Sequence, residues 1–215
     1  MDHHEVKPRI SRPAVLVMGY RRHDITAKTL AANLNNAGMD FGLFVGDHRG
    51  ICRNSNIMLW RALSEGYDAF CIMGNDITEP YEWLKARVDF ANGVPKSGGV
   101  SIPIGWMTEK PKTMTVIGNI LWPRDVVEKV GAWDERLDPH GPVDLDYCER
   151  ANKAGHLNWY LPNLMANHLH GHDGVELYGY NKQDVIDEKW KVYLERLADP
   201  NYFIPFEDMS KYYER

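Results

Sequence analysis

Four groups of polar residues in this sequence carry side chains that can bind a metal ion, bind phosphate or move a proton. The first, Gly74-Asn75-Asp76, directly follows an apolar run. Asn and Asp are frequent turn formers, because their side chains bond to nearby backbone groups. Carboxylate oxygens are also ligands that hard divalent cations prefer. The spacing therefore leaves two interpretations open, a simple turn and a site where Asp76 holds a cation over a diphosphate.

A second group, Asp47-His48-Arg49-Gly50, follows another apolar run and precedes Arg53-Asn54. One interpretation is a solvated loop that caps the next helix. The other is a nucleotide site, in which Asp47 accepts hydrogen bonds from a base or ribose.

The third group contains Asp134-Glu135 and the pair Asp144 and Asp146, with the pair at a predicted helix start. Helix capping explains one aspartate of that pair, because acidic side chains there satisfy the helix N-terminus. It does not explain both. A carboxylate kept ionised at a helix N-terminus can act as a general base toward an incoming hydroxyl.

The fourth group is His168-Leu-His170-Gly-His172-Asp173. In an extended chain, alternate side chains point the same way, so these histidines could share a metal ion. A surface loop is the alternative. Because no cysteine lies nearby, we favour a single imidazole ligand shared with Asp76 over a structural zinc site.

The elements that would position these groups alternate along the chain. Apolar runs predict strands over 14–19, 41–45 and 69–73, and helical spacing predicts helices over 26–37, 54–64 and 81–92. Such alternation is typical of a parallel sheet covered by helices on both faces. Because these sheets bind ligands at the carboxyl ends of their strands, the residues after each strand are candidates for binding. They are Tyr20 to Asp24, then Asp47 to Arg49, then Asn75 and Asp76.

The second half of the chain gives weaker patterns. Short strands are predicted at 99–102, 114–117 and 157–161, and helices at 123–130, 144–154 and 182–197. Asp24 is the predicted N-cap of the first helix. We expect a mobile leader over 1–13, one catalytic domain over 14–174, and a helical extension over 175–215 that packs on it.

Net charge, cysteine content and the length of the apolar runs limit the classes of protein to which this chain can belong. The 215 residues carry a formal charge of −5, which gives no general attraction to nucleic-acid phosphates. The three cysteines are scattered, which suits a reducing compartment, and no apolar run is long enough to cross a bilayer. The sequence therefore predicts a soluble, cytoplasmic protein without a membrane span.

The order of these motifs over about 14–174 resembles the family-two glycosyltransferases, whose catalytic domain has the GT-A fold, a Rossmann-like α/β architecture. The matching segments, in chain order, are Val15-Leu-Val-Met-Gly-Tyr20, Asp47, Gly50-Ile-Cys-Arg53-Asn54, Met73-Gly-Asn75-Asp76-Ile77, Val130-Gly-Ala-Trp-Asp134-Glu135, Asp144-Leu-Asp146-Tyr-Cys-Glu-Arg150 and His168. The tail, with Lys189-Trp190 and Pro205-Phe206, is similar to those of small phage and bacterial glycosyltransferases.

The resemblance implies a function and assigns roles to residues. It implies transfer of a hexose from a nucleotide diphosphate sugar, a UDP-sugar in the first instance, with inversion and with manganese or magnesium as cofactor. Asp76 and His168 would bind the metal, with His170 as the alternative histidine. Asp144 would be the catalytic base.

The donor would be bound by residues that follow the first three strands. Asp47 would contact the base, Arg53 the phosphate or ribose, and Tyr20, Arg21 and Asn75 would complete the pocket. Two departures from the family pattern matter. Met73 and Asn75 replace the first positions of the acidic metal motif, and Val143 replaces the Glu before Asp144.

Two alternatives remain beside the enzyme. A sugar-phosphate nucleotidyltransferase would need a glycine-rich loop after the first strand, and Tyr20-Arg-Arg-His-Asp24 contains no glycine. The altered metal motif keeps a non-catalytic nucleotide-sugar-binding or scaffold protein as the second alternative. The acceptor hydroxyl is open among a glycan, a small molecule, a protein and, less favoured by the acidic charge, a hydroxylated base of phage DNA.

Overall fold

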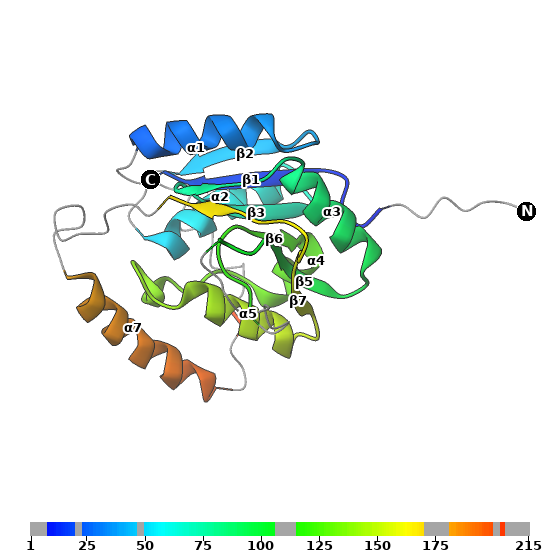
Figure 1. Ribbon diagram of the computed structural model, residues 1–215. Helices are drawn as coiled ribbons and strands as arrows, with labels where there is room; N and C mark the ends of the chain where they lie inside the picture. Colours follow the sequence, from blue (N-terminus) through cyan, green and yellow to red (C-terminus); the bar gives the residue numbers. More distant parts are fainter. Residues whose placement is uncertain are drawn as a thin grey trace, which may run out of the picture.

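The computed structural model describes residues 8–19, 23–46, 50–105, 115–169, 181–199 and 203–204. Within them, one six-stranded sheet has the spatial order β2-β1-β3-β6-β5-β7 (Figure 1). Its strands are β1 (Pro13–Met18), β2 (Gly42–Gly46), β3 (Ala69–Gly74), β5 (Ser97–Ser101), β6 (Ile120–Pro123) and β7 (Leu157–Tyr160). A second, two-stranded sheet pairs β4 (Ile77–Thr78) with β8 (Asn167–His168).

The main sheet is mostly parallel. β1 pairs in parallel with β2 and β3, and β5 pairs in parallel with β7. β6 runs antiparallel to both of its neighbours, β3 and β5. The carboxyl ends of β1, β2 and β3 consequently lie at the same edge of the sheet.

Helices cover both faces of the sheet (Figure 1). They are α1 (His23–Asn35), α2 (Ile51–Ser64), α3 (Trp83–Gly93), α4 (Arg124–Val130), α5 (Val143–Lys153) and α7 (Lys182–Leu197), with a short 3-10 helix, η1, over Glu135–Leu137. One core cluster joins α1 and α3 to the sheet, and the other joins α2, α4 and α5. Strand β1 contributes Ala14 and Leu16 to one cluster and Val15 and Val17 to the other, as its continuous apolar run requires.

The sequence missed β6. It predicted a strand over 114–117, whereas residues 115–117 form no strand and the strand lies at Ile120–Pro123. Only three apolar residues precede Pro123, a run too short to stand out from a loop. Pro123 was assigned to the first turn of a helix and instead ends β6, immediately before α4. The predicted N-cap Asp24 lies inside α1, which begins at His23.

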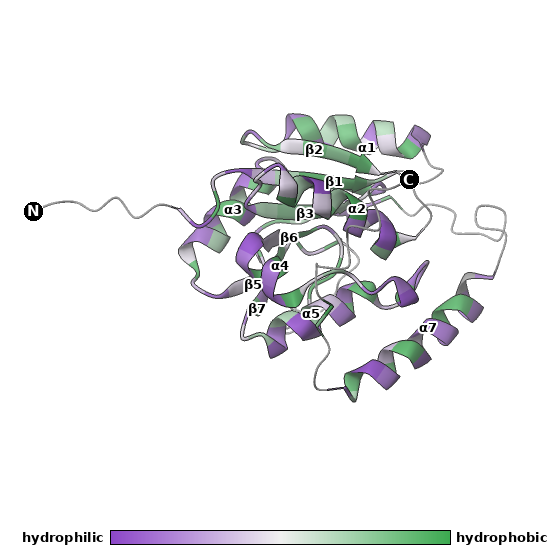
Figure 2. Ribbon diagram, turned by 180° about the vertical axis from the view of Figure 1, so that it is seen from behind, coloured by the Kyte–Doolittle hydropathy of each residue, from purple (hydrophilic) through white to green (hydrophobic). Residues whose placement is uncertain are grey.

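Helix α7 matches its predicted bounds and lies on the α5 side of the molecule, away from β2 (Figure 1). It carries both hydrophobic and hydrophilic residues along its length (Figure 2). Tyr193 is buried against the core, and Arg196 forms an ion pair with Asp134 next to η1. No helix in the described part of the chain is long and apolar enough to span a bilayer.

Candidate active site

The structure places Asp76 and His168 side by side, although they are distant in sequence. Asp76 lies in the turn between β3 and β4, and His168 ends β8, the partner of β4. The His168 Nε2 atom is 3.1 Å from Asp76 Oδ2, and both side chains are partly exposed. The backbone N–H of Leu169 also donates to the Asp76 carbonyl at 2.7 Å. A carboxylate and an imidazole therefore meet at the carboxyl end of β3.

The turn that carries Asp76 is also fixed to helix α1. The Thr29 hydroxyl donates to the Asn75 carbonyl at 2.6 Å, and the Asn75 amide donates to the Thr26 hydroxyl at 3.1 Å. The amide of Asn33 donates to the Ile77 carbonyl at 2.9 Å. Asn75 was predicted to contact the donor, and in the structure its side-chain amide is directed at α1.

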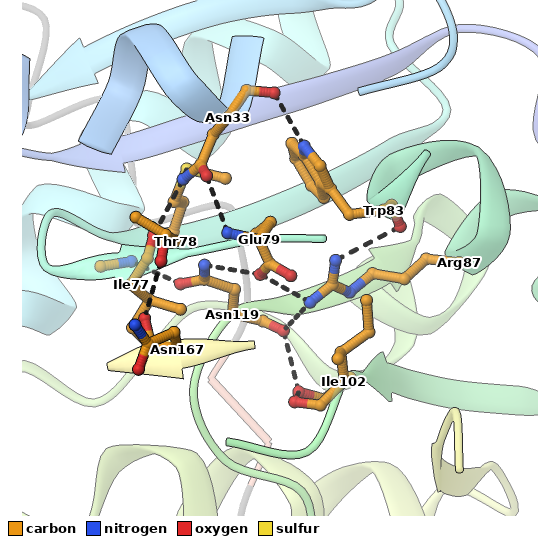
Figure 3. Close-up of polar contacts among 12 residues, drawn as sticks. Asn33, Ile77, Thr78, Glu79, Trp83, Arg87, Ile102, Asn119 and Asn167 are labelled. Atoms are coloured by element: carbon orange, nitrogen blue, oxygen red, sulfur yellow. Dashed lines mark hydrogen bonds and ion pairs between the residues drawn. The ribbon is translucent and has the colours of Figure 1, made fainter. Parts of the chain in front are cut away.

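A buried polar network supports the same turn from inside the protein (Figure 3). Arg87 of α3 forms an ion pair of 2.8 Å with Glu79, and both side chains are fully buried. The Asn119 amide donates to the same Glu79 oxygen at 2.7 Å, and the Asn119 oxygen accepts from the Gly74 backbone N–H at 2.8 Å. Asn33 accepts from the Glu79 backbone N–H and so joins the network to α1. These bonds offset part of the cost of burying polar groups, which is several kcal/mol for an unpaired one, while Glu79 Oε2 and Arg87 Nε have no hydrogen-bond partner among the described residues.

A pocket opens beside this turn, and Asp144 lines it. The wall includes Gly74 and Ile77, which flank Asn75 and Asp76, together with Gly118 and a mostly apolar set of side chains: Met18, Ile51, Ile72, Ile120, Trp122, Trp133, Val143 and Tyr147. Its volume is about 160 Å³, which is small beside the roughly 300–1,000 Å³ of typical ligand sites. The described residues therefore enclose a cavity smaller than a typical ligand site.

Burial in this apolar pocket raises the pKa of Asp144 to about 7, and a hydrogen bond from the Gly118 backbone N–H at 3.2 Å partly opposes the rise. The sequence predicted that the helix N-terminus would keep this carboxylate ionised. That prediction was wrong, because the loss of hydration on burial raises the pKa of Asp144 more than the hydrogen bond from Gly118 lowers it. A carboxyl group with a pKa near 7 can exchange a proton with substrate near neutral pH.

The other acidic residues of the motifs have structural roles. Asp146 forms a buried ion pair with Arg150 at 2.8 Å, and Arg150 also donates to the carbonyls of Val130 and Ala132. Asp134 is buried, caps η1 by accepting from the Arg136 backbone N–H, and pairs with the side chains of that residue and of α7. Of the aspartates at the start of α5, only Asp144 lines the pocket.

Of the remaining predicted site residues, Arg53 lies in the described part of the chain. Arg53 is exposed in the first turn of α2, where Asp138 accepts from the backbone N–H groups of Cys52 and Arg53. This cap on α2 was not recognised in the sequence. Tyr20, Arg21, Asp47 and His170 lie outside the described residues.

The donor set fits a divalent cation that is shared with a substrate. No group of three or more His, Cys, Asp or Glu side chains that could hold a metal occurs within the described ranges. A closed structural zinc site needs four protein ligands. One carboxylate and one imidazole instead suit an ion such as Mg²⁺ or Mn²⁺ that completes its coordination with substrate phosphates and water.

Comparison with known proteins shows the fold. No family model and no curated protein sequence matches this chain. The catalytic domain of Drosophila β1,4-galactosyltransferase 7 in complex with xylobiose superposes with a TM-score of 0.64 at 16% identity, over 93% of this chain and 84% of that one. A mutant of the same enzyme in complex with manganese, UDP-Gal and xylobiose gives a TM-score of 0.56 at 16% identity, over 75% and 72%. The chain has the GT-A glycosyltransferase fold, which confirms the predicted fold class.

The buried network predicts a large cost for removing one of its charges. Replacing Arg87 by Met leaves the Glu79 carboxylate buried without its counter-charge, and we expect a loss of about 3–5 kcal/mol in the free energy of unfolding. Urea denaturation monitored by circular dichroism measures it. The exposed pair of Lys85 and Asp89 on the same helix is the control, and Lys85→Ala should cost below about 1 kcal/mol. Equal losses in the two variants would contradict the structural role of the network.

The raised pKa of Asp144 predicts a pH-dependent stability. Between its ordinary value near 3.8 and about 7, the folded protein binds this proton more tightly than the unfolded chain, so the contribution of Asp144 to stability falls as pH rises. The amide of the Asp144→Asn variant does not ionise and lacks this penalty. We therefore expect that variant to gain stability relative to wild type from pH 5 to pH 8, by about 1–2 kcal/mol because partial exposure screens the charge. A difference between the two proteins that stays constant across this range would contradict the assignment.

Proposed function

We propose that this protein is a metal-dependent glycosyltransferase that moves a hexose from a nucleotide diphosphate sugar, a UDP-sugar in the first instance, to an acceptor hydroxyl with inversion. The observation that carries the proposal is the meeting of Asp76 and His168 at the carboxyl end of β3, beside a pocket lined by Asp144. The structural neighbours solved with xylobiose or with manganese and UDP-Gal support it. Family-two character, of the small phage and bacterial type, remains part of the proposal.

Asp144 acts as the general base. Its carboxylate lines the pocket next to the metal-binding turn, where it can accept the proton of the acceptor hydroxyl as that oxygen attacks the anomeric carbon. A base with a pKa near the working pH combines a useful fraction of the ionised form with enough basicity to take the proton. The apolar wall keeps water from competing with the acceptor.

Asp76 and His168 hold the divalent cation, manganese or magnesium, with His170 as the alternative histidine. When bound, such an ion neutralises the charge that develops on the departing diphosphate. The backbone bonds to Gly74, Asn75, Asp76 and Ile77 keep the ligand turn in place before substrate arrives. Preorganised ligands of this kind reduce the cost of reaching the reactive arrangement.

The residues after β1 and β2 bind the donor. Asp47 contacts the base, Arg53 the phosphate or ribose, and Tyr20 and Arg21 line the pocket. Arg53 is exposed at the N-terminus of α2, a position from which a guanidinium can reach a bound anion. The acceptor is a hydroxyl compound, and the xylobiose bound by a structural neighbour favours a glycan among the candidates.

Removal of the base should abolish transfer and spare donor binding. Asp144→Asn keeps the size of the side chain and removes the proton acceptor, so we expect kcat to fall by about 10²–10⁴-fold. The measurement is release of UDP from UDP-sugars with manganese and a panel of acceptors, together with a titration of UDP-sugar binding. Glu149→Gln, on the same helix and away from the pocket lining, should behave as wild type. Unchanged turnover of Asp144→Asn would remove Asp144 from the mechanism.

Removal of a metal ligand should abolish the effect of metal on stability. A ligand that binds only the folded protein raises its melting temperature, so manganese with UDP should raise the Tm of wild type by several degrees. Asp76→Asn and His168→Ala should each lose most of that rise. Asp89→Asn, an exposed change on α3, should retain it. If UDP stabilises all four proteins equally with and without manganese, the chain binds nucleotide without a metal at this site.

A further inference from the structure

We propose that Asn119 is a positioning residue that fixes the metal-binding turn relative to the catalytic base. The proposal rests on the function proposed above and goes beyond it, because Asn119 touches neither the metal ligands' functional atoms nor the substrate site. Asn119 holds the turn through its hydrogen bond with the Gly74 backbone N–H. Its neighbour Gly118 donates a backbone hydrogen bond to Asp144.

Two adjacent residues bind the two halves of the site. The backbone N–H of Gly118 donates to Asp144 Oδ2 at 3.2 Å. The side-chain oxygen of Asn119 accepts from the backbone N–H of Gly74 at 2.8 Å, two residues before Asp76. One peptide unit thus separates the contact to the base from the contact to the ligand turn, so the two must keep a fixed spacing.

The segment that makes these contacts is itself held by buried groups (Figure 3). Asn119 is 2% exposed, and its amide donates to Glu79 at 2.7 Å. Its carbonyl accepts from Arg87 at 3.1 Å and from the Ser101 hydroxyl at 2.9 Å. The same hydroxyl lies 2.8 Å from the Ile117 carbonyl. These contacts join the segment to α3 and to β5, as well as to the end of β3.

The contacts made at positions 118 and 119 require particular residue types. Position 119 needs an acceptor for the Gly74 N–H and a donor for the Glu79 carboxylate, and the asparagine amide supplies both. Aspartate would place a second carboxylate against Glu79. Leucine would leave the Gly74 N–H unbonded and Glu79 with Arg87 alone as its side-chain partner. Gly118 has φ of +84°, and a Cβ there would lie 2.9 Å from the Ile104 side chain. Gly118 therefore permits the tight turn that brings both contacts together.

A positioning role predicts a loss of rate larger than the loss of stability explains. Groups that orient metal ligands typically change metal affinity or activity by about 10–100-fold when they are removed. Loosening this segment should affect the ligand turn and the base together. We therefore expect a weaker apparent affinity for manganese and a lower kcat, with little change in the KM for the acceptor.

The test compares Asn119→Ala with a matched control, Asn158→Ala, in the full-length protein with UDP-sugar, manganese and acceptor. Asn158 is fully buried, and its side-chain oxygen accepts from the Gly99 backbone N–H at 2.8 Å, the same type of contact at a site away from the pocket lining. At a temperature where circular dichroism shows all proteins folded, Asn119→Ala should lower kcat and manganese affinity about 10–100-fold. Asn158→Ala should leave both within about twofold of wild type.

Ser101→Ala is the second variant, because it loosens the backbone of 117–119 and leaves the Asn119 side chain in place. It should lower kcat by a smaller factor than Asn119→Ala and remain folded even where Asn119→Ala does not. Equal effects of Asn119→Ala and Asn158→Ala, or normal kcat and manganese affinity in folded Asn119→Ala or Ser101→Ala, would overturn the positioning role. Absence of transfer and of manganese binding in wild type would instead overturn the proposed function.

Discussion

The buried ion pair between Glu79 and Arg87 is the interaction on which the arrangement of the site depends. Both side chains are fully buried, so their charges need partners of fixed geometry. Asn119 completes the pair and reaches Gly74, while Asn33 binds the backbone on the other side of the same turn. The short segment that carries Asp76 is thereby held at both of its ends by groups with no freedom to move into water.

The topology then brings His168 to Asp76, the two side chains proposed to hold the cation. β4 is only two residues long, and its pairing with β8 places His168 opposite Ile77, next to Asp76. The Leu169 N–H to Asp76 carbonyl bond closes this contact. Asp144 lies in the first turn of α5 and lines the pocket beside the turn that carries Asp76. The GT-A fold thus supplies three separate elements, and short backbone contacts set their relative positions.

Sequence patterns predicted the elements with strong periodicity and missed those whose order comes from tertiary contacts. The apolar runs at 14–19 and 69–73 and the spacing over 182–197 gave elements close to their observed bounds, because burial repeats along them. β6, β4 and β8 are too short to show any period. Their residues are ordered by pairing with strands distant in sequence, which no local pattern records.

The same distinction applies to the site. Asp76, His168 and Asp144 could be named as candidates from the order of the motifs, because that order resembles a known family, although each short motif by itself also fits a turn, a loop or a helix cap. The supporting residues Asn33, Glu79, Arg87 and Asn119 could not, because each is a single polar residue in an otherwise ordinary helix or loop. The raised pKa of Asp144 could not be predicted from the sequence either. It depends on apolar side chains of β1, β3, α2 and β6 that line the same pocket as the carboxyl group.

A crystal structure of the protein with manganese and UDP would show whether Asp76 and His168 hold a cation at the donor diphosphate, because anomalous scattering locates the ion independently of the protein coordinates. We predict a manganese ion bound by Asp76 Oδ2 and His168 Nε2 and by the diphosphate, with Asp144 facing the acceptor side of the same pocket. UDP bound without an ion between those two side chains, or an ion held elsewhere on the protein, would rule out Asp76 and His168 as the metal ligands.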